Sequence, residues 1–144
     1  MLKQLRTAAV ALVLAGGASI TTAHHSAAKF DFTKNDWMSG TVKDIRVINP
    51  HMSLTLVTPD ATGKPKEVVF EGHSVNNFYR MGWRNGMIVA GDQIKVHFNP
   101  RKDGVDGGFV NGFITAKGQE VVFRMPGQDL PPPPPGDTSP APGK

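Results

Sequence analysis

Apolar and polar residues alternate along two stretches in the middle of the chain. Between residues 93 and 99 every second position is apolar (Ile94, Val96 and Phe98), and polar residues stand between them. The same pattern runs through residues 51–58. Since side chains of a strand point to opposite faces in turn, strict alternation predicts half-buried β-strands. Each of these strands should bury its apolar face and leave the other face, including His97, to solvent.

Further short runs of this kind lie on either side. Residues 40–48 carry apolar positions with one skipped step, which favours a β-bulge. Proline, glycine and aspartate between residues 59 and 65 are typical of a hairpin loop. The additional strands predicted on this basis are residues 40–48, 66–71, 108–115 and 119–124.

One segment has helical rather than strand spacing. Phe78 and Tyr79 follow Val75 at intervals that place them on one helical face, and Ser74 stands where an N-cap residue is expected. The pattern predicts a short helix over residues 75–81 that packs on the sheet.

The order of these elements is three strands, one short helix, and two or three more strands. Nothing in it repeats the strand–helix–strand unit of parallel sheets, so a mainly β fold is favoured. A helix between the third and fourth strands is the order of an OB-type barrel. We therefore expect a small OB-like open barrel of five to six strands with one short helix, with a small barrel or roll of another topology as the alternative.

The two ends of the chain differ from this middle part. Residues 1–23 combine a basic start, an apolar run and small residues before His24, as in a secretory signal peptide. The apolar run is shorter than the ~20 residues of a membrane span. We expect export to the periplasm and no stable membrane insertion after cleavage, with a retained anchor as the alternative. The barrel would then occupy residues 24–125.

Residues 126–144 form a proline-rich tail that contains five consecutive prolines, Pro131 to Pro135. Such a run favours polyproline II and buries little apolar surface, so the tail is expected to be disordered. Two interpretations are open: a solvated spacer, or a docking peptide for a periplasmic protein partner.

The amino-acid composition limits the kinds of site that the protein can form. The 144 residues include no cysteine, which excludes disulfides, thiolate metal sites and a cysteine nucleophile. The formal net charge is +4, but the basic residues are scattered and form no patch. The charge therefore gives no support to nucleic-acid binding. Motifs typical of hydrolases, metalloproteases and phosphate-binding loops are also missing from the sequence, which favours a binding protein over an enzyme.

Two histidines stand at the predicted cleavage point. Cleavage after Ala23 would give a mature chain that begins with His24 and His25, whose terminal amine and imidazoles suit copper. Cleavage one residue earlier would give Ala23-His24-His25, in which the amine, two backbone amides and the His25 imidazole can form a square-planar Cu(II) site. The alternative is two solvated histidines at a frayed terminus.

His51 and His73 are the next candidates as metal ligands. His51 follows Asn49-Pro50 at the start of a strand, and His73 lies at a strand-to-helix turn. Each has a structural alternative: a rim histidine bonded to backbone for His51, and a residue at the helix entry for His73. A metal-free alternative function is a binding face for a small ligand, a glycan or a protein partner, formed by Phe78, Tyr79 and Trp83. Core packing is the slightly favoured explanation for these aromatic residues.

Several segments together resemble a family of small exported bacterial proteins catalogued as domain of unknown function 6152. The resemblance covers most of residues 23–122 and implies a periplasmic β-barrel module without an established activity. The segments that carry it are Ala23-His24-His25-Ser26 with Phe30-Asp31, Gly40-Thr41-Val42 continuing to Ile48-Asn49-Pro50-His51, Asn77 to Gly82-Trp83, and Gly91-Asp92-Gln93-Ile94-Lys95-Val96.

Overall fold

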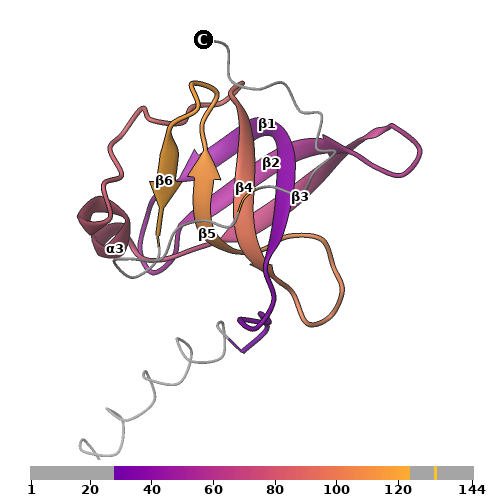
Figure 1. The fold of residues 1–144 in the computed structure, drawn as a ribbon, viewed down its shortest axis with the longest axis horizontal. Helices are drawn as coiled ribbons and strands as arrows, with labels where there is room; N and C mark the ends of the chain where they lie inside the picture. The colour runs from indigo at the N-terminus through magenta and orange to yellow at the C-terminus, as the bar shows by residue number, and fades with distance from the viewer. Residues whose placement is uncertain (1–27, 124–131, 133–144) are drawn as a thin grey trace, which may run out of the picture.

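A computed structural model describes residues 28–123 and residue 132. The predicted signal peptide, His24, His25 and nearly all of the predicted tail lie outside these residues. The described elements, shown in Figure 1, are β1 (Asp36–Arg46), β2 (Ser53–Pro59), β3 (Pro65–Glu71), α3 (Val75–Arg80), β4 (Gln93–Pro100), β5 (Gly108–Ile114) and β6 (Glu120–Val122).

The six strands form one sheet that closes into a barrel. Their order is β3-β2-β1-β4-β5-β6, and all of these neighbours are antiparallel. A parallel pairing of Glu71 in β3 with Phe109 in β5 joins the two ends and leaves β6 as an extra strand beside β5. The predicted mainly β barrel with one short helix is therefore confirmed, and it is closed.

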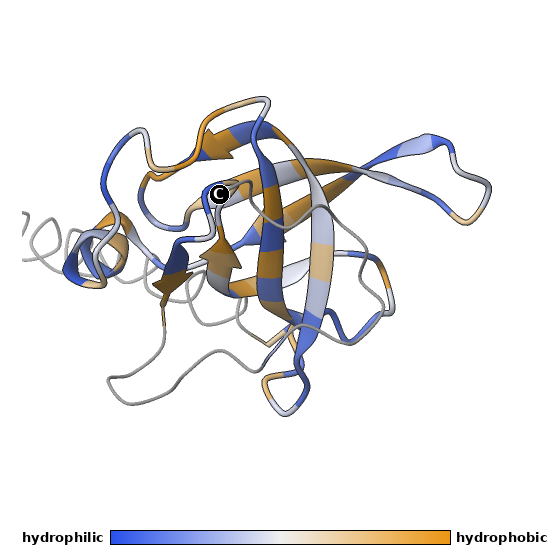
Figure 2. Ribbon diagram, turned by 45° about the horizontal axis from the view of Figure 1, so that its top comes forward, coloured by the Kyte–Doolittle hydropathy of each residue, from blue (hydrophilic) through white to orange (hydrophobic). Residues whose placement is uncertain are grey.

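The alternating residues form the core as predicted. Met52, Leu54 and Leu56 are fully buried, and Val96 and Phe98 of β4 pack in the same interior cluster. Orange and blue bands alternate along the strands in Figure 2 for this reason. The bulge predicted in the first strand is present between Val42 and Asp44.

The helix α3 is short and is held mainly by Phe78, its one buried residue. The Phe78 ring stacks on that of Phe123 with 3.9 Å between centroids. Ser74 occupies the predicted N-cap position in an extended conformation, but its side chain makes no capping hydrogen bond. Trp83, just beyond the helix, is 2% exposed and packs against Phe78 and Phe113.

The expectation that His97 is solvated is wrong. His97 does lie on the outer face of β4, but its exposed fraction is 0%. Its ring lies 5.0 Å from that of Trp37 on β1, and Gly112 is its partner on β5. Alternation predicts which face a residue occupies, and it does not predict what covers that face.

Among the residues that the structure describes, no helix is long and apolar enough to cross a membrane.

Candidate functional site

Two of the predicted ligand residues, His51 and His73, meet at one end of the barrel. This is where β2 begins and β3 ends, since Ser53 pairs with Glu71 in the β2–β3 ladder. The ladder is prolonged by two backbone hydrogen bonds: Met52 N–H donates to the His73 carbonyl (3.0 Å), and Gly72 N–H donates to the Met52 carbonyl (3.1 Å). These bonds hold the backbones of residues 51 and 73 close together across the two strands.

The His51 ring is oriented by a backbone carbonyl. Its Nδ1 lies 3.3 Å from the carbonyl oxygen of Gly72, in a partly buried position. In the tautomer that donates this hydrogen bond, Nε2 carries the lone pair of the ring. A histidine that donates one ring N–H to a carbonyl and presents the other nitrogen has the usual orientation of a metal ligand.

The His73 ring is half-buried and has the same kind of partner. It packs edge-on against Phe109 with 4.8 Å between centroids, and it hydrogen-bonds the backbone of Phe123. Burial lowers the pKa of His73 below its ordinary 6.5; the bond to Phe123 opposes this shift, and the charge of His51 adds to it. His73 is therefore neutral at neutral pH, which is the form that binds metals.

The start of the described chain is fastened to the same end of the barrel. Lys29 forms an ion pair with Glu71, two residues before His73. The Phe30 ring lies 5.5 Å from that of Phe109, the residue that contacts His73.

The backbone of this segment is fastened as well. Lys102 N–H donates to the Lys29 carbonyl (2.9 Å), and Lys102 Nζ donates to the Ala28 carbonyl (2.9 Å). Figure 1 shows this indigo segment beneath the lower ends of β4 and β5.

Two histidines do not make a complete site. The part of the chain that the structure describes holds no group of three or more His, Cys, Asp or Glu residues able to bind a metal ion. His51 and His73 are thus a pair, and a tight site requires donors from elsewhere. His24 and His25, the other predicted ligands, lie outside the described residues.

The three aromatic residues of the alternative binding face do not share an exposed surface. Phe78 and Trp83 are 0% and 2% exposed, whereas Tyr79 is 38% exposed and donates a hydrogen bond from its hydroxyl to Asn85 Oδ1 (2.6 Å). Interior packing accounts for the first two. A hollow of about 380 Å³ lies elsewhere, between β3 and the loop that joins β4 to β5.

Sequence reasoning did not find the anchor of residues 28–30. Lys29 and Glu71 are 42 positions apart, and Phe109 is further still along the chain. Lys29 and Glu71 do not belong to a recognised motif. The sequence alone therefore does not predict their ion pair. The Phe30-Asp31 pair in the family-like pattern was the one available hint.

Comparison with known proteins gives one finding. A model of a family of unknown function, DUF6152, matches residues 11–111. No curated protein and no solved structure matches the chain. The matched region includes β1 to β4, His51, His73 and the anchored residues 28–30. The chain therefore belongs to the DUF6152 family.

Proposed function

We propose that this protein is a periplasmic copper-binding module whose site combines the mature N-terminus, His24 and His25 with His51 and His73. One observation carries the proposal: the histidine pair and the anchored segment that leads back toward His25 lie at the same end of the barrel. Its role would be to bind or deliver the metal rather than to catalyse a reaction.

The connection between the two halves of the site is short. Three residues lie between His25 and Lys29, so the four steps of chain that join them span at most about 14 Å. Lys29 is bound to Glu71, which lies about 7 Å along the strand direction from residue 73. The terminal histidines are thus within covalent reach of His51 and His73.

The donor chemistry favours copper. Imidazoles and a terminal amine are borderline nitrogen ligands, and for such sites Cu(II) binds most tightly among the divalent first-row metals. The backbone contacts of His51 and His73 orient both rings, which lowers the entropic cost of bringing them to the metal. With His24 as the first residue, its amine and imidazole would chelate the ion, and a barrel imidazole would complete a nitrogen-rich site.

The test uses the exported protein, with its N-terminus determined by sequencing. Cu(II) is titrated in and followed by electron paramagnetic resonance, for the native chain and for His51→Ala and His73→Ala. We expect one tight nitrogen-rich site whose spectrum changes in both variants. Tyr79→Ala is the control, since it removes an exposed side chain and should leave the spectrum unchanged.

Weak copper binding that is indifferent to His51 would contradict the proposal. It would favour the second function, a metal-free binding module for a small ligand, a glycan or a periplasmic protein partner. The hollow beside β3 supports this alternative, because it places Lys66 and Arg101 near the exposed Val69 and Val105. Lys66 is paired with Asp106 and Arg101 with Asp103, so the hollow suits a ligand with both polar and apolar groups and no net charge.

A further inference from the structure

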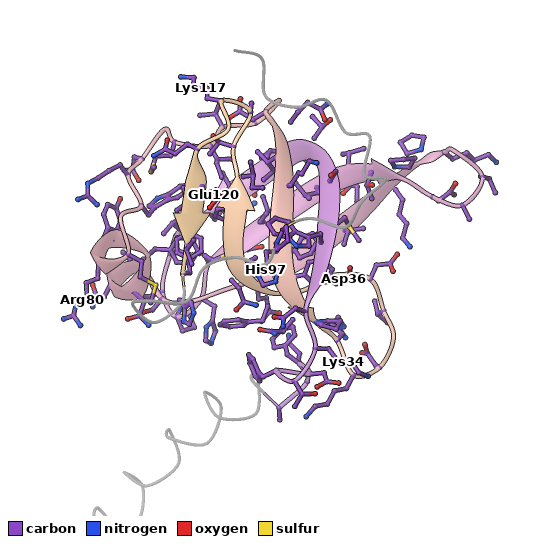
Figure 3. The ribbon with its side chains drawn as sticks, viewed as in Figure 1. Lys34, Asp36, Arg80, His97, Lys117 and Glu120 are labelled. Carbon is purple, nitrogen blue, oxygen red and sulfur yellow. The ribbon has the colours of Figure 1, made fainter. Side chains whose placement is uncertain are left out.

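A second feature lies on the outer face of the barrel. Trp37 of β1 pairs with His97 of β4, His97 pairs with Gly112 of β5, and Gly112 pairs with Val122 of β6. Directly paired residues of antiparallel strands point to the same side of a sheet. These four residues therefore form one row across the outside of the barrel, called here the Trp37 row. Figure 3 labels His97 within it.

The Trp37 row is covered in part: His97 and Gly112 are buried, whereas Trp37 and Val122 are partly exposed. His97 is 0% exposed, yet its partner Gly112 has no side chain and Trp37 reaches it from one side only. The next outward position of β4, Asn99, is covered by residues 34 and 35, since its Nδ2 donates to the Lys34 carbonyl (2.6 Å).

The row also contains an unsatisfied donor. In the part of the chain that the structure describes, two buried side-chain donors have no hydrogen-bond partner, the indole Nε1 of Trp37 and that of Trp83; Trp83 lies in the core, and Trp37 lies on the outer face. A buried N–H without an acceptor is destabilising, so on an outer face such a group is a place where a further acceptor is expected.

We propose that the proline-rich segment 126–135 of the same chain docks across the Trp37 row and supplies this acceptor. This segment is the expected occupant because the chain leads directly from the row into it. Val122 is the last member of the row and Phe123 follows it directly. Three strand spacings, about 14 Å, separate Val122 from Trp37. The seven residues 124–130 span up to about 25 Å, which is ample.

The chemistry of the two surfaces matches. Proline has no backbone N–H, so a polyproline II run has carbonyls without internal partners. Aromatic-lined grooves bind such runs because their rings pack on the proline rings. An indole N–H in the groove can donate a hydrogen bond to a backbone carbonyl of the run. Gly112 has no side chain, so a crossing chain can approach the backbone of β5 closely at this position.

The experiment follows the indole N–H signals in ¹H–¹⁵N spectra, with Trp37→Phe used for assignment. The chain has two tryptophans, and Trp83 is an internal control because it is buried in the core. We compare the full mature chain with a chain that ends at Met125 and with a full-length variant in which Pro131 to Pro135 are serines. In both variants we expect the Trp37 indole hydrogen to exchange with water at least tenfold faster, with the Trp83 signal unchanged.

An unchanged Trp37 exchange rate in both variants would overturn the proposal. A change in the shortened chain alone would overturn the assignment to the prolines. Dilution distinguishes the source of the segment: a Trp37 signal of the full chain that is independent of protein concentration supports docking within one molecule. A signal that approaches that of the shortened chain on dilution would place the tail on a second copy, and would contradict the proposal.

Discussion

At the scale of single residues, the candidate site depends on how the barrel orients and buries the rings of His51 and His73. Backbone carbonyls orient both rings, and burial keeps His73 uncharged at neutral pH. These are the properties that a metal ligand needs before the metal arrives. The charge of His51 also lowers the pKa of His73, which gives a direct test of their proximity.

Replacing His51 by glutamine should raise the pKa of His73. The charge of His51 is one of the causes that lower it, so removing that charge moves the pKa back toward 6.5, while the larger effect of burial remains. The measurement is a ¹H–¹⁵N titration of the metal-free protein. An unchanged His73 midpoint in this variant would show that the two rings are not close neighbours.

The same shift has a consequence for stability. Because the pKa of His73 is lower in the folded chain, the unfolded chain binds more protons just below pH 6.5. The contribution of a neutral His73 is complete above that pH and is lost as the pH falls through the folded-state value. We expect acid sensitivity in this window for the metal-free protein, measured by urea unfolding, and less of it in His73→Phe.

The sequence predicts His51 and His73 as candidate ligands, but it does not predict that they lie close together. The types of residue and the turns around them were readable, whereas their contact depends on a strand register that no local pattern encodes. His97 shows the opposite failure. Its polar identity and outward position predicted solvation, and the covering of that face by other parts of the molecule was invisible in the sequence.

At the scale of elements, the anchored segment 28–30 matters most, because it directs the N-terminus toward the histidine pair. Lys29→Met removes the ion pair with Glu71 without removing any proposed ligand. We expect Cu(II) binding to weaken several-fold, as measured by competition with a chelator. Lys43→Met is the matched control, since it breaks a comparable cross-strand ion pair with Glu67. Equal affinities for the two variants would contradict a role for the anchor.

The helix α3 should depend on one side chain. Phe78→Ala removes its buried contact with Phe123 and should destabilise the protein by about 3–5 kcal/mol in urea unfolding. Tyr79→Ala, at the neighbouring exposed position, should cost much less. A larger effect at Tyr79 than at Phe78 would contradict the assignment of Phe78 to the core.

Element positions were readable from the sequence wherever one face of a strand is apolar. The strands β2 and β4 lie within a few residues of their predicted bounds, and α3 ends one residue early. The closing contact between β3 and β5 rests on one pair, Glu71 with Phe109. Pairing between strands so distant in the chain follows from the whole barrel and not from any local pattern.

At the scale of the whole molecule, a closed barrel without disulfides acts as a rigid support. Its closure at Glu71 and Phe109 places the end of β3, the start of β5 and the anchored segment around the histidine pair. The outer face, with the Trp37 row, is a second surface, which ends at Val122 beside Phe123, the backbone partner of His73. One small fold thus carries two proposed binding regions, one for a metal and one for its own C-terminal segment.

The most direct test of the copper proposal is the Cu(II) affinity of the mature chain compared with that of a synthetic peptide of residues 24–33 with the same N-terminus. Both are measured by competition with one chelator at one pH. If His51 and His73 complete the site, the folded chain binds at least tenfold more tightly, which is about 1.4 kcal/mol. Equal affinities would mean that the barrel contributes nothing, and would contradict the proposed function.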